Sequence, residues 1–367
     1  MKIAHLLDSL NRGGAEILAL DICRNAKANN LDLTFITTGD GTLKENFRRS
    51  GVEFIELKRN LPVDPQIIFK LRKLIVERKI DVIHTHQSVE AVHAYFAAKG
   101  TSAKIVLTHH GFVPDKKNLY ALRFLLPRIA QNVVVSRALL KWYAEEIKLK
   151  FPQNTQIIYN GVDAKRLDSH DGNLKMELDL PENSRLFGMI GNFYRDPRKD
   201  QLTICKALPK IFAEVENAYF LFVGKTENGA EDKYEECARF CAENKIADRV
   251  FFLGARSDVP EILNSLDIFV LSSLHEGLPI AVLEAMLTGV SCVLSNIEPL
   301  LEVSKNGRYA EIFQTENAAA LAEKIIGLAE NEHLRLKLAK DAKIYAEGSF
   351  SIEAHVENLK KLYKSIV

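Results

Sequence analysis

The stretch SSLHEGLPIAVLEAMLTG, residues 272–289, decides the fold of the second half of the chain. It follows an apolar run, residues 268–271, which is typical of a buried strand. Pro279 suits the first turn of a helix, and Gly289 suits the position just past its end. The start of such a helix presents free backbone N–H groups and a partial positive charge, which favour phosphate. The stretch therefore predicts a strand-turn-helix unit with an anion site at its turn.

Two glutamates belong to this unit: Glu276 precedes the helix, and Glu284 lies about one and a half turns inside it. Carboxylates accept hydrogen bonds from sugar hydroxyls, while the helix N–H groups hold a phosphate. The pair therefore indicates a nucleotide-sugar site. A surface glutamate and a helix-face glutamate of an ordinary α/β unit would show the same spacing, so spacing alone does not separate the two interpretations.

The residues around the glutamates favour the first interpretation. HEGLPIAVLEAMLTGV, residues 275–290, resembles the E-x7-E motif of the retaining glycosyltransferases of family 4 (glycosyl transferases group 1), which have the GT-B fold. The resemblance implies that Glu276 contacts the donor sugar, with Gly277 and Leu278 beside it in the donor site. It also implies that Glu284 binds the ribose hydroxyls.

The N-terminal stretch also has a strand, a glycine loop and a helix, which is typical of a doubly wound α/β domain. The loop contains Gly13 and Gly14 but no G-x-G-x-x-G, so a dinucleotide fingerprint is absent. The sequence GGAE, residues 13–16, is similar to the G-G-x-E loop of the same family. The resemblance places Gly13, Gly14 and Glu16 on the phosphate and acceptor side.

Four histidines follow two further predicted strands: His84 and His86 in DVIHTH, and His109 and His110 in THHG. On a strand, the first two share a face and the last two point oppositely, so at most three could converge. No Cys, Asp or Glu completes a convincing set of metal ligands, and we expect a structural or hydrogen-bonding role for His84 and His109. The resemblance implies that His110 contacts the donor sugar and that His86 lines the cleft.

A second glycine loop, GNFYRDPRKD at residues 191–200, precedes a helix. Its cations, Arg195, Arg198 and Lys199, suit a pyrophosphate leaving group, although a solvated charge run has the same composition. The loop resembles the family's phosphate motif with Lys199 in the lysine position. Asn192 departs from that motif, which has arginine there. Either Arg195 or Arg198 supplies the missing charge, or backbone groups and Lys199 hold the phosphates.

The polar, turn-rich residues 168–183 predict a domain boundary. We predict an N-terminal acceptor-side Rossmann-like domain, 1–167, with a C-terminal helix, 351–367, that packs back on it. Residues 168–350 form the predicted nucleotide-sugar-binding Rossmann-like domain, and the resemblance implies that the two domains face a central cleft. Within the second, Gly254 ends a strand whose loop resembles the one that contacts the nucleotide base. Gly348-Ser349-Phe350-Ser351 is predicted to interrupt the last helical region.

Composition limits the other possibilities. The chain has 367 residues, 47% hydrophobic and 26% charged, which is ordinary for a two-domain globular protein. A net charge of +1 gives no electrostatic reason to expect nucleic acid as a partner. Five scattered cysteines fit a reducing cytosol. No apolar run of about 20 residues and no signal peptide is recognised, so we expect a cytoplasmic protein.

The segment 116–128 is basic and apolar, and it has two interpretations. An amphipathic helix that covers a sheet has this pattern, and this is the interpretation we favour. A helix that rests on an anionic membrane surface has it too, and would give the protein a peripheral membrane contact.

Taken together, the resemblance implies a hexosyl- or related glycosyltransferase (EC 2.4 class) that transfers a sugar from a nucleotide-diphosphate donor to a glycan or lipid-linked acceptor, with retention. His110, Glu276 and Lys199 are the expected catalytic residues, and no cofactor or obligatory metal is expected. No protein nucleophile is expected, because in this family the leaving phosphate takes the acceptor's proton on the same face. The alternatives are a catalytically weak or silent nucleotide-sugar-binding protein, which the Asn192 departure would fit, and a sugar-nucleotide epimerase on the same fold.

Overall fold

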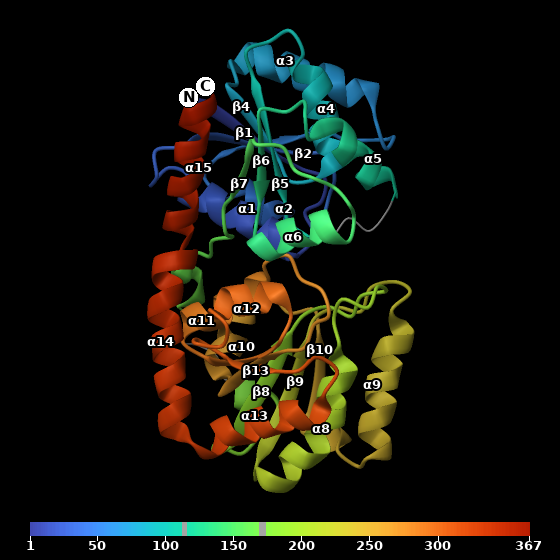
Figure 1. The fold of residues 1–367 in the computed structure, drawn as a ribbon, viewed down its shortest axis with the longest axis vertical. Helices are drawn as coiled ribbons and strands as arrows, with labels where there is room; N and C mark the ends of the chain where they lie inside the picture. Colours follow the sequence, from blue (N-terminus) through green and yellow to red (C-terminus); the bar gives the residue numbers. More distant parts are fainter. Residues whose placement is uncertain (112–115, 169–173) are drawn as a thin grey trace. The chain divides into compact units, whose positions relative to one another are not determined.

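A computed structural model describes residues 1–111, 116–168 and 174–367. These residues form two compact units (Figure 1): unit 1 comprises residues 1–162 and 350–367, and unit 2 comprises residues 163–349. The sequence-based boundary at 167/168 lies five residues later than the boundary between the units. Part of the predicted boundary stretch, residues 169–173, lies outside the described residues.

Unit 1 is built on a seven-stranded sheet in the order β3-β2-β1-β4-β5-β6-β7, with every pair parallel. The strands are short, and the central ones are largely buried, as expected for a parallel sheet whose faces are both covered. Their bounds are β1 (Lys2–Leu7), β2 (Asp32–Thr37), β3 (Glu53–Glu56), β4 (Val82–Thr85), β5 (Lys104–His109), β6 (Gln131–Val134) and β7 (Thr155–Ile157).

Helices lie on both faces of this sheet (Figure 1). One group packs together as α3, α4 and α5, and the other as α1 with α2 and α15. The C-terminal helix α15 thus belongs to unit 1, as predicted, and buries an apolar stripe that includes Leu359 and Tyr363. The helix bounds are α1 (Gly14–Asn25), α2 (Lys44–Arg48), α3 (Pro65–Arg78), α4 (Ser88–Ala98), α5 (Lys116–Leu125), α6 (Arg137–Glu145) and α15 (Ile352–Ile366).

Unit 2 contains a six-stranded parallel sheet in the order β10-β9-β8-β11-β12-β13. Helix α8 packs with α9 and α13, whereas α11 packs with α10 and η1. The strands are β8 (Arg185–Ile190), β9 (Ala218–Val223), β10 (Val250–Gly254), β11 (Ile268–Leu271), β12 (Ser291–Ser295) and β13 (Glu311–Phe313). The helices are η1 (Ala164–Leu167), α7 (Leu174–Glu177), α8 (Gln201–Glu214), α9 (Glu231–Glu243), η2 (Ala247–Arg249), α10 (Val259–Ser265), α11 (Ile280–Thr288), α12 (Glu298–Ser304), α13 (Ala318–Glu330) and α14 (Glu332–Phe350).

Each sheet has one point at which the strand order reverses, between β1 and β4 in unit 1 and between β8 and β11 in unit 2. Open α/β sheets bind ligands outside the carboxyl ends of the strands at this point. In unit 1 the two strands lead into residues 8–13 and into His86. In unit 2 they lead into residues 191–200 and 272–279. The topology thus brings the predicted loops of each unit to its switch point.

The prediction of a helix break at residues 348–351 is largely wrong. Helix α14 continues through Gly348 to Phe350, because a glycine inside a helix costs only about 1 kcal/mol relative to alanine. The break is confined to Ser351, whose hydroxyl accepts a hydrogen bond from the backbone N–H of Ala354, 3.3 Å away, and so caps α15.

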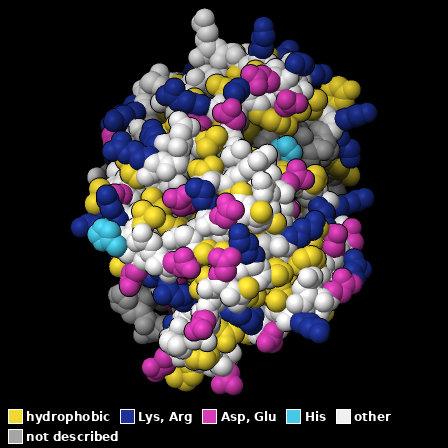
Figure 2. Space-filling view, turned by 60° about the horizontal axis from the view of Figure 1, so that its bottom comes forward, with side chains coloured by type: hydrophobic (Ala, Val, Ile, Leu, Met, Phe, Trp, Pro, Cys, Tyr) yellow, Lys and Arg dark blue, Asp and Glu magenta, His cyan; other side chains and the backbone are white. Residues whose placement is uncertain are grey.

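Helix α5 buries Leu122 and Leu125 and packs beside α4, as expected for a helix that covers a sheet. Its Tyr120 is 67% exposed. None of the helices formed by the described residues is both long and apolar enough to cross a bilayer. Lysine and arginine side chains are interspersed with acidic ones over the face drawn in Figure 2.

Candidate active site

The two loops at the switch point of unit 2 are joined along their length. The N–H of Asp200 donates to the carbonyl of Ser272 (3.1 Å), and the N–H of Leu274 donates to the carbonyl of Arg198 (2.9 Å). The Ser272 hydroxyl also donates to the Asp200 carboxylate (3.1 Å), which in turn caps α8 by accepting from the N–H of Thr203 (3.2 Å). The side chains of these loops are therefore held in one fixed arrangement.

This arrangement pairs Lys199 with Glu276, two residues that the sequence assigned to catalysis. Their side chains form an ion pair and are only 8% and 11% exposed. The Ser273 hydroxyl donates to the same carboxylate oxygen of Glu276 (2.7 Å). A buried ammonium held this way is a strong electrostatic group, because the local dielectric is lower than that of water. It can stabilise an anion that develops next to it.

The other residues of the 191–200 loop have different partners. The guanidinium of Arg198 donates from Nε to Asp196 Oδ1 (2.7 Å) and from Nη2 to Asp196 Oδ2 (2.5 Å), and it lies over the Tyr194 ring. This contact holds the pKa of the Asp196 carboxyl below its ordinary value. The amide oxygen of Asn192 accepts from the backbone N–H of Lys225 (3.0 Å) and so joins two strand ends. Arg195 is exposed, and the described residues supply no acidic partner for it.

Glu284 lies on α11, 5% exposed, and pairs with Arg166 of η1 at 2.5 Å. Arg166 was not predicted from the sequence. The Asp163 side chain caps η1 by accepting from the N–H of Lys165 (3.1 Å) and so fixes the helix that carries Arg166. The remaining predicted donor-site residues lie at strand ends of unit 2: Gly277 and Leu278 between β11 and α11, and Gly254 at the end of β10.

In unit 1, Gly13 is the N-cap of α1 and Gly14 its first residue. The Glu16 carboxylate lies over this start, since a Cβ on Gly13 would be 2.5 Å from one of its oxygens. The predicted loop residues are therefore together at the start of α1.

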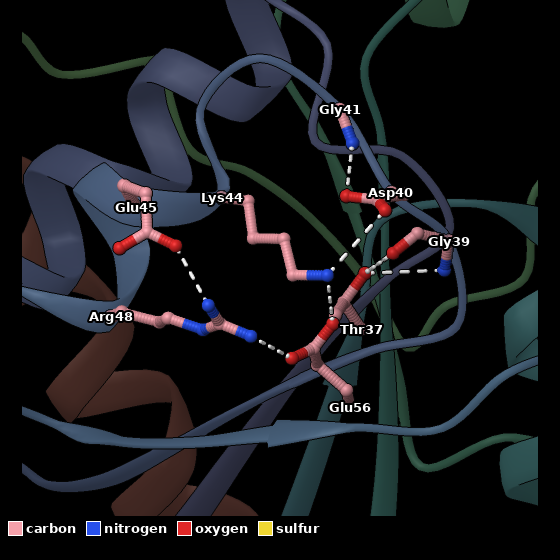
Figure 3. Close-up of polar contacts among 8 residues, drawn as sticks. All are labelled: Thr37, Gly39, Asp40, Gly41, Lys44, Glu45, Arg48 and Glu56. Carbon is pink, nitrogen blue, oxygen red and sulfur yellow. Dashed lines mark hydrogen bonds and ion pairs between the residues drawn. The ribbon is translucent and has the colours of Figure 1, made fainter.

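The loop after β2, which the sequence reasoning did not single out, braces the loop that contains Gly13. The N–H of Leu10 donates to the carbonyl of Asp40 (3.1 Å), and the N–H of Leu43 donates to the carbonyl of Leu10 (2.8 Å). Figure 3 shows how this brace is held: the Asp40 carboxylate accepts from the N–H of Gly41 (2.8 Å) and from Lys44 (3.4 Å), which also pairs with Glu56.

The adjacent residues His109 and His110 point to opposite sides, as expected at the end of a strand. His86 Nδ1 lies 2.8 Å from His110 Nε2, whereas His109 points the other way and bonds Asn132 (3.2 Å). His84 is buried beside them, and His5 of β1, which the sequence reasoning missed, completes the group. Burial lowers the pKa of each of these imidazoles, that of His5 to about 3 and that of His109 to about 4. His5, His84 and His86 each place a ring nitrogen within 4.8 Å of the others, so as neutral groups they could also hold a metal ion.

A buried carboxyl lies near the end of β1. Glu90, fully buried on α4, accepts from Arg59 (2.6 Å) and from the Thr38 hydroxyl (3.1 Å) through one oxygen. Its other oxygen is buried without a hydrogen-bond partner in the described part of the chain. Burial, and next the nearby Asp8 carboxylate, raise the pKa of Glu90 from 4.5 to about 7.

This raised pKa predicts a pH dependence. Folded Glu90 holds its proton up to about pH 7, whereas the unfolded chain loses it near pH 4.5. The contribution of Glu90 to the free energy of unfolding is therefore fully present below pH 4.5 and is lost as pH rises to about 7. Glu90→Gln cannot ionise, so its stability relative to the wild type should rise by about 1–3 kcal/mol between pH 5 and pH 8. Denaturant unfolding at four pH values measures this difference. Glu77→Gln, an exposed change on α3, is the control, and a Glu90→Gln difference that stays flat with pH would contradict the prediction.

Comparison with known proteins agrees with the resemblance seen in the sequence. A family model described as Glycosyltransferase Family 4 matches residues 12–166, and one described as Glycosyl transferases group 1 matches residues 172–345. The chain is 27% identical to the UDP-Gal:alpha-D-GlcNAc-diphosphoundecaprenol alpha-1,3-galactosyltransferase of Escherichia coli, over 100% of this chain and 97% of that protein. It is 26% identical to the N-acetyl-alpha-D-glucosaminyl L-malate synthase of Bacillus anthracis, over 97% of this chain and 94% of that protein.

Among solved structures, HepE of Anabaena in complex with UDP and glucose superposes with a TM-score of 0.87. The two sequences are 20% identical, and the match covers 100% of both chains. At this identity the likeness shows a shared fold, which extends over both units.

Proposed function

The chain belongs to the family 4 glycosyltransferases with the GT-B fold, and we propose from this premise that it transfers a hexose or related sugar from a UDP-sugar to a hydroxyl of a lipid-linked glycan. The observation that carries the proposal is the buried Lys199–Glu276 pair at the switch point of unit 2. The donor class is supported by the UDP in the HepE structure and the UDP-Gal named for the Escherichia coli relative.

In the proposed site, Lys199 neutralises the diphosphate leaving group and Glu276 accepts from hydroxyls of the donor sugar. Glu284, held by Arg166, accepts from the ribose hydroxyls. Arg195 supplies the second cation in place of the arginine absent at Asn192, because Arg198 is already engaged by Asp196. The reaction uses no cofactor or obligatory metal, since these cations stabilise the departing charge.

We propose retention of the anomeric configuration. The α-linked product named for the Escherichia coli relative supports it, as does the family resemblance. Glu276 is engaged by Lys199 and Ser273 and so is not offered as a nucleophile. The leaving phosphate therefore takes the acceptor's proton. On the acceptor side, Gly13, Gly14 and Glu16 of unit 1 are the proposed contacts, whereas His86 is buried with both ring nitrogens bonded to His5 and His110 and so acts only through His110. The exposed face of α5 around Tyr120 is the proposed contact with the membrane surface that carries the acceptor.

Nucleotide-sugar binding should raise the thermal midpoint. A ligand at about 100 times its Kd stabilises the folded protein by about 2.7 kcal/mol, which corresponds to roughly 3–4 °C for a chain of 367 residues. We expect this shift with UDP-sugars and not with ADP- or GDP-sugars, measured by scanning fluorimetry. Glu284→Gln should lose most of it, because a charge-assisted hydrogen bond contributes about 1.5–3 kcal/mol.

The matched control is Glu243→Gln, an exposed change at the end of α9 that should keep the full shift. No shift with any nucleotide sugar, or an equal shift in Glu284→Gln, would contradict the proposed donor site. A thermal shift in a protein that shows neither Glu276-dependent sugar transfer nor Glu276-dependent hydrolysis of the donor would instead favour a silent nucleotide-sugar-binding protein.

A further inference from the structure

Six side chains of unit 1 form one continuous hydrogen-bonded chain that ends at His110. In order, the contacts are Thr108 Oγ1 to His84 Nε2 (2.6 Å), His84 Nδ1 to Tyr363 Oη (2.5 Å), Tyr363 Oη to His5 Nε2 (3.0 Å), His5 Nδ1 to His86 Nε2 (3.1 Å) and His86 Nδ1 to His110 Nε2 (2.8 Å). The members come from β1, β4, β5 and α15, with His86 and His110 just past strand ends, and all but His110 are buried.

Each neutral imidazole has one N–H donor and one nitrogen acceptor. The three inner histidines use both ring nitrogens within the chain, so a proton on one nitrogen fixes the role of its neighbour. Two arrangements satisfy every contact and let the Tyr363 hydroxyl donate to one of its histidine partners, with all donors pointing toward His110 or all pointing toward Thr108. A third, in which Tyr363 accepts from both His84 and His5, leaves its own buried O–H without an acceptor among the described residues and is disfavoured by that unpaired donor. Neutral rings are the right description, because burial holds the pKa of all four histidines below the ordinary value and that of the Tyr363 hydroxyl above it.

Thr108 decides between the two arrangements. If donors point toward His110, the Thr108 hydroxyl donates to His84 and needs no further partner. If they point the other way, Thr108 accepts from His84, and its own buried O–H finds no acceptor among the described residues. Because a buried donor without an acceptor costs free energy, the first arrangement is favoured by roughly 5- to 150-fold. His110 Nε2 then accepts from His86, so the proton of His110 is on Nδ1.

We infer that Thr108, His84, Tyr363, His5 and His86 are positioning residues that set His110 as a fixed Nδ1–H donor toward an oxygen of the bound donor substrate. The use of this donor on the nucleotide sugar rests on the function proposed above. Because its Nδ1 carries the proton, His110 can donate a hydrogen bond to an oxygen of the nucleotide sugar. It cannot act as a base through Nδ1. The C-terminal helix thereby acts on the site through Tyr363, although it lies far from His110 in the sequence.

A metal ion at His5, His84 and His86 is the competing explanation for the cluster. It would have to displace hydrogen bonds that already engage both ring nitrogens of all three residues. The hydrogen-bonded chain accounts for every one of those nitrogens without an ion, and we favour it for this reason.

The test is the tautomer of His110 in the full-length protein with ¹⁵N-labelled histidine, read from two-bond ¹H–¹⁵N correlation spectra without ligand and assigned with His110→Gln. We expect Nδ1–H at His110 in the wild type. Thr108→Val removes the deciding hydroxyl, which lies five contacts along the hydrogen-bonded chain from His110, and Tyr363→Phe breaks the chain in the middle. Each should reduce the tautomer preference at His110 toward equal populations.

Thr85→Val is the matched control, since it removes a buried hydroxyl from β4 that bonds the carbonyl of Val106 and lies outside the chain. An Nε2–H tautomer at His110 in the wild type would overturn the inference, and so would a His110 tautomer unchanged in both variants. Stoichiometric metal in the purified protein, with histidine signals that change on chelation, would also overturn it. Addition of UDP-sugar then tests the proposed function separately, because the tautomer result stands whether or not the ligand perturbs His110.

Discussion

Replacing Lys199 with methionine should lower kcat for sugar transfer by about 10²–10³, comparable to the loss of one preorganised oxyanion donor. The ammonium is buried and fixed beside Glu276, so it stabilises leaving-group charge in the transition state without reorganisation. Its long aliphatic stem packs near Gly191, and methionine preserves much of that packing. The measurement is steady-state transfer from the UDP-sugar that gives the thermal shift, with kcat and KM determined separately.

Stability must be separated from chemistry in this experiment. Lys199→Met leaves the Glu276 carboxylate buried beside Ser273 without its cation, which costs about 3–5 kcal/mol when a buried pair is broken. The double variant Lys199→Met/Glu276→Gln removes both charges and should recover most of the stability but none of the activity. Lys206→Met, an exposed change on α8, should keep both. A single variant with near wild-type kcat would contradict the assignment of Lys199 to the leaving group.

The sequence predicted the fold well because its signals were local. Strand-glycine-helix units at residues 2–16 and 268–289 each carry their own boundaries, and a parallel α/β series allows few alternatives. The C-cap at Gly289 formed where expected, with the left-handed φ of +85°. The break near Gly348 was wrong because helix continuation depends on packing along α14, which a single glycine does not reveal.

The candidate site was predictable only where its residues share a motif. Glu276 and Lys199 follow from two motifs, and their ion pair follows from the switch point that brings the loops together. Arg166 and Tyr363 were missed, because their partners are 118 and 279 residues away in the sequence. His5 was missed for a related reason: a lone histidine in an apolar strand is indistinguishable from a core residue until β4 and α15 are placed beside β1.

Gly41→Ala should be a strongly destabilising single-methyl change near the β1 loop. A Cβ at residue 41 would lie 2.2 Å from the carbonyl carbon of Leu10 and 2.3 Å from the backbone nitrogen of Asn11. Both atoms are backbone, so no side chain can rotate away, and the loops after β1 and β2 must separate. That separation breaks the two Leu10 hydrogen bonds that brace the glycine loop. We expect a loss of about 3 kcal/mol or more, which lowers the thermal midpoint by roughly 4 °C or more for a chain of 367 residues.

The neighbouring change Asp40→Ala separates this steric effect from the loss of local polar contacts. Asp40 is exposed, and among the described residues its carboxylate bonds the N–H of Gly41 and the ammonium of Lys44, so its removal should change the thermal midpoint far less than Gly41→Ala does (Figure 3). Gly327→Ala, in an open helical position of α13, should be neutral or slightly stabilising. Equal midpoints for Gly41→Ala and Asp40→Ala would show that the two loops can part at little cost. The brace would then not be what holds Gly13 and Gly14 in place, and the acceptor-side role of that loop would have to rest on α1 alone.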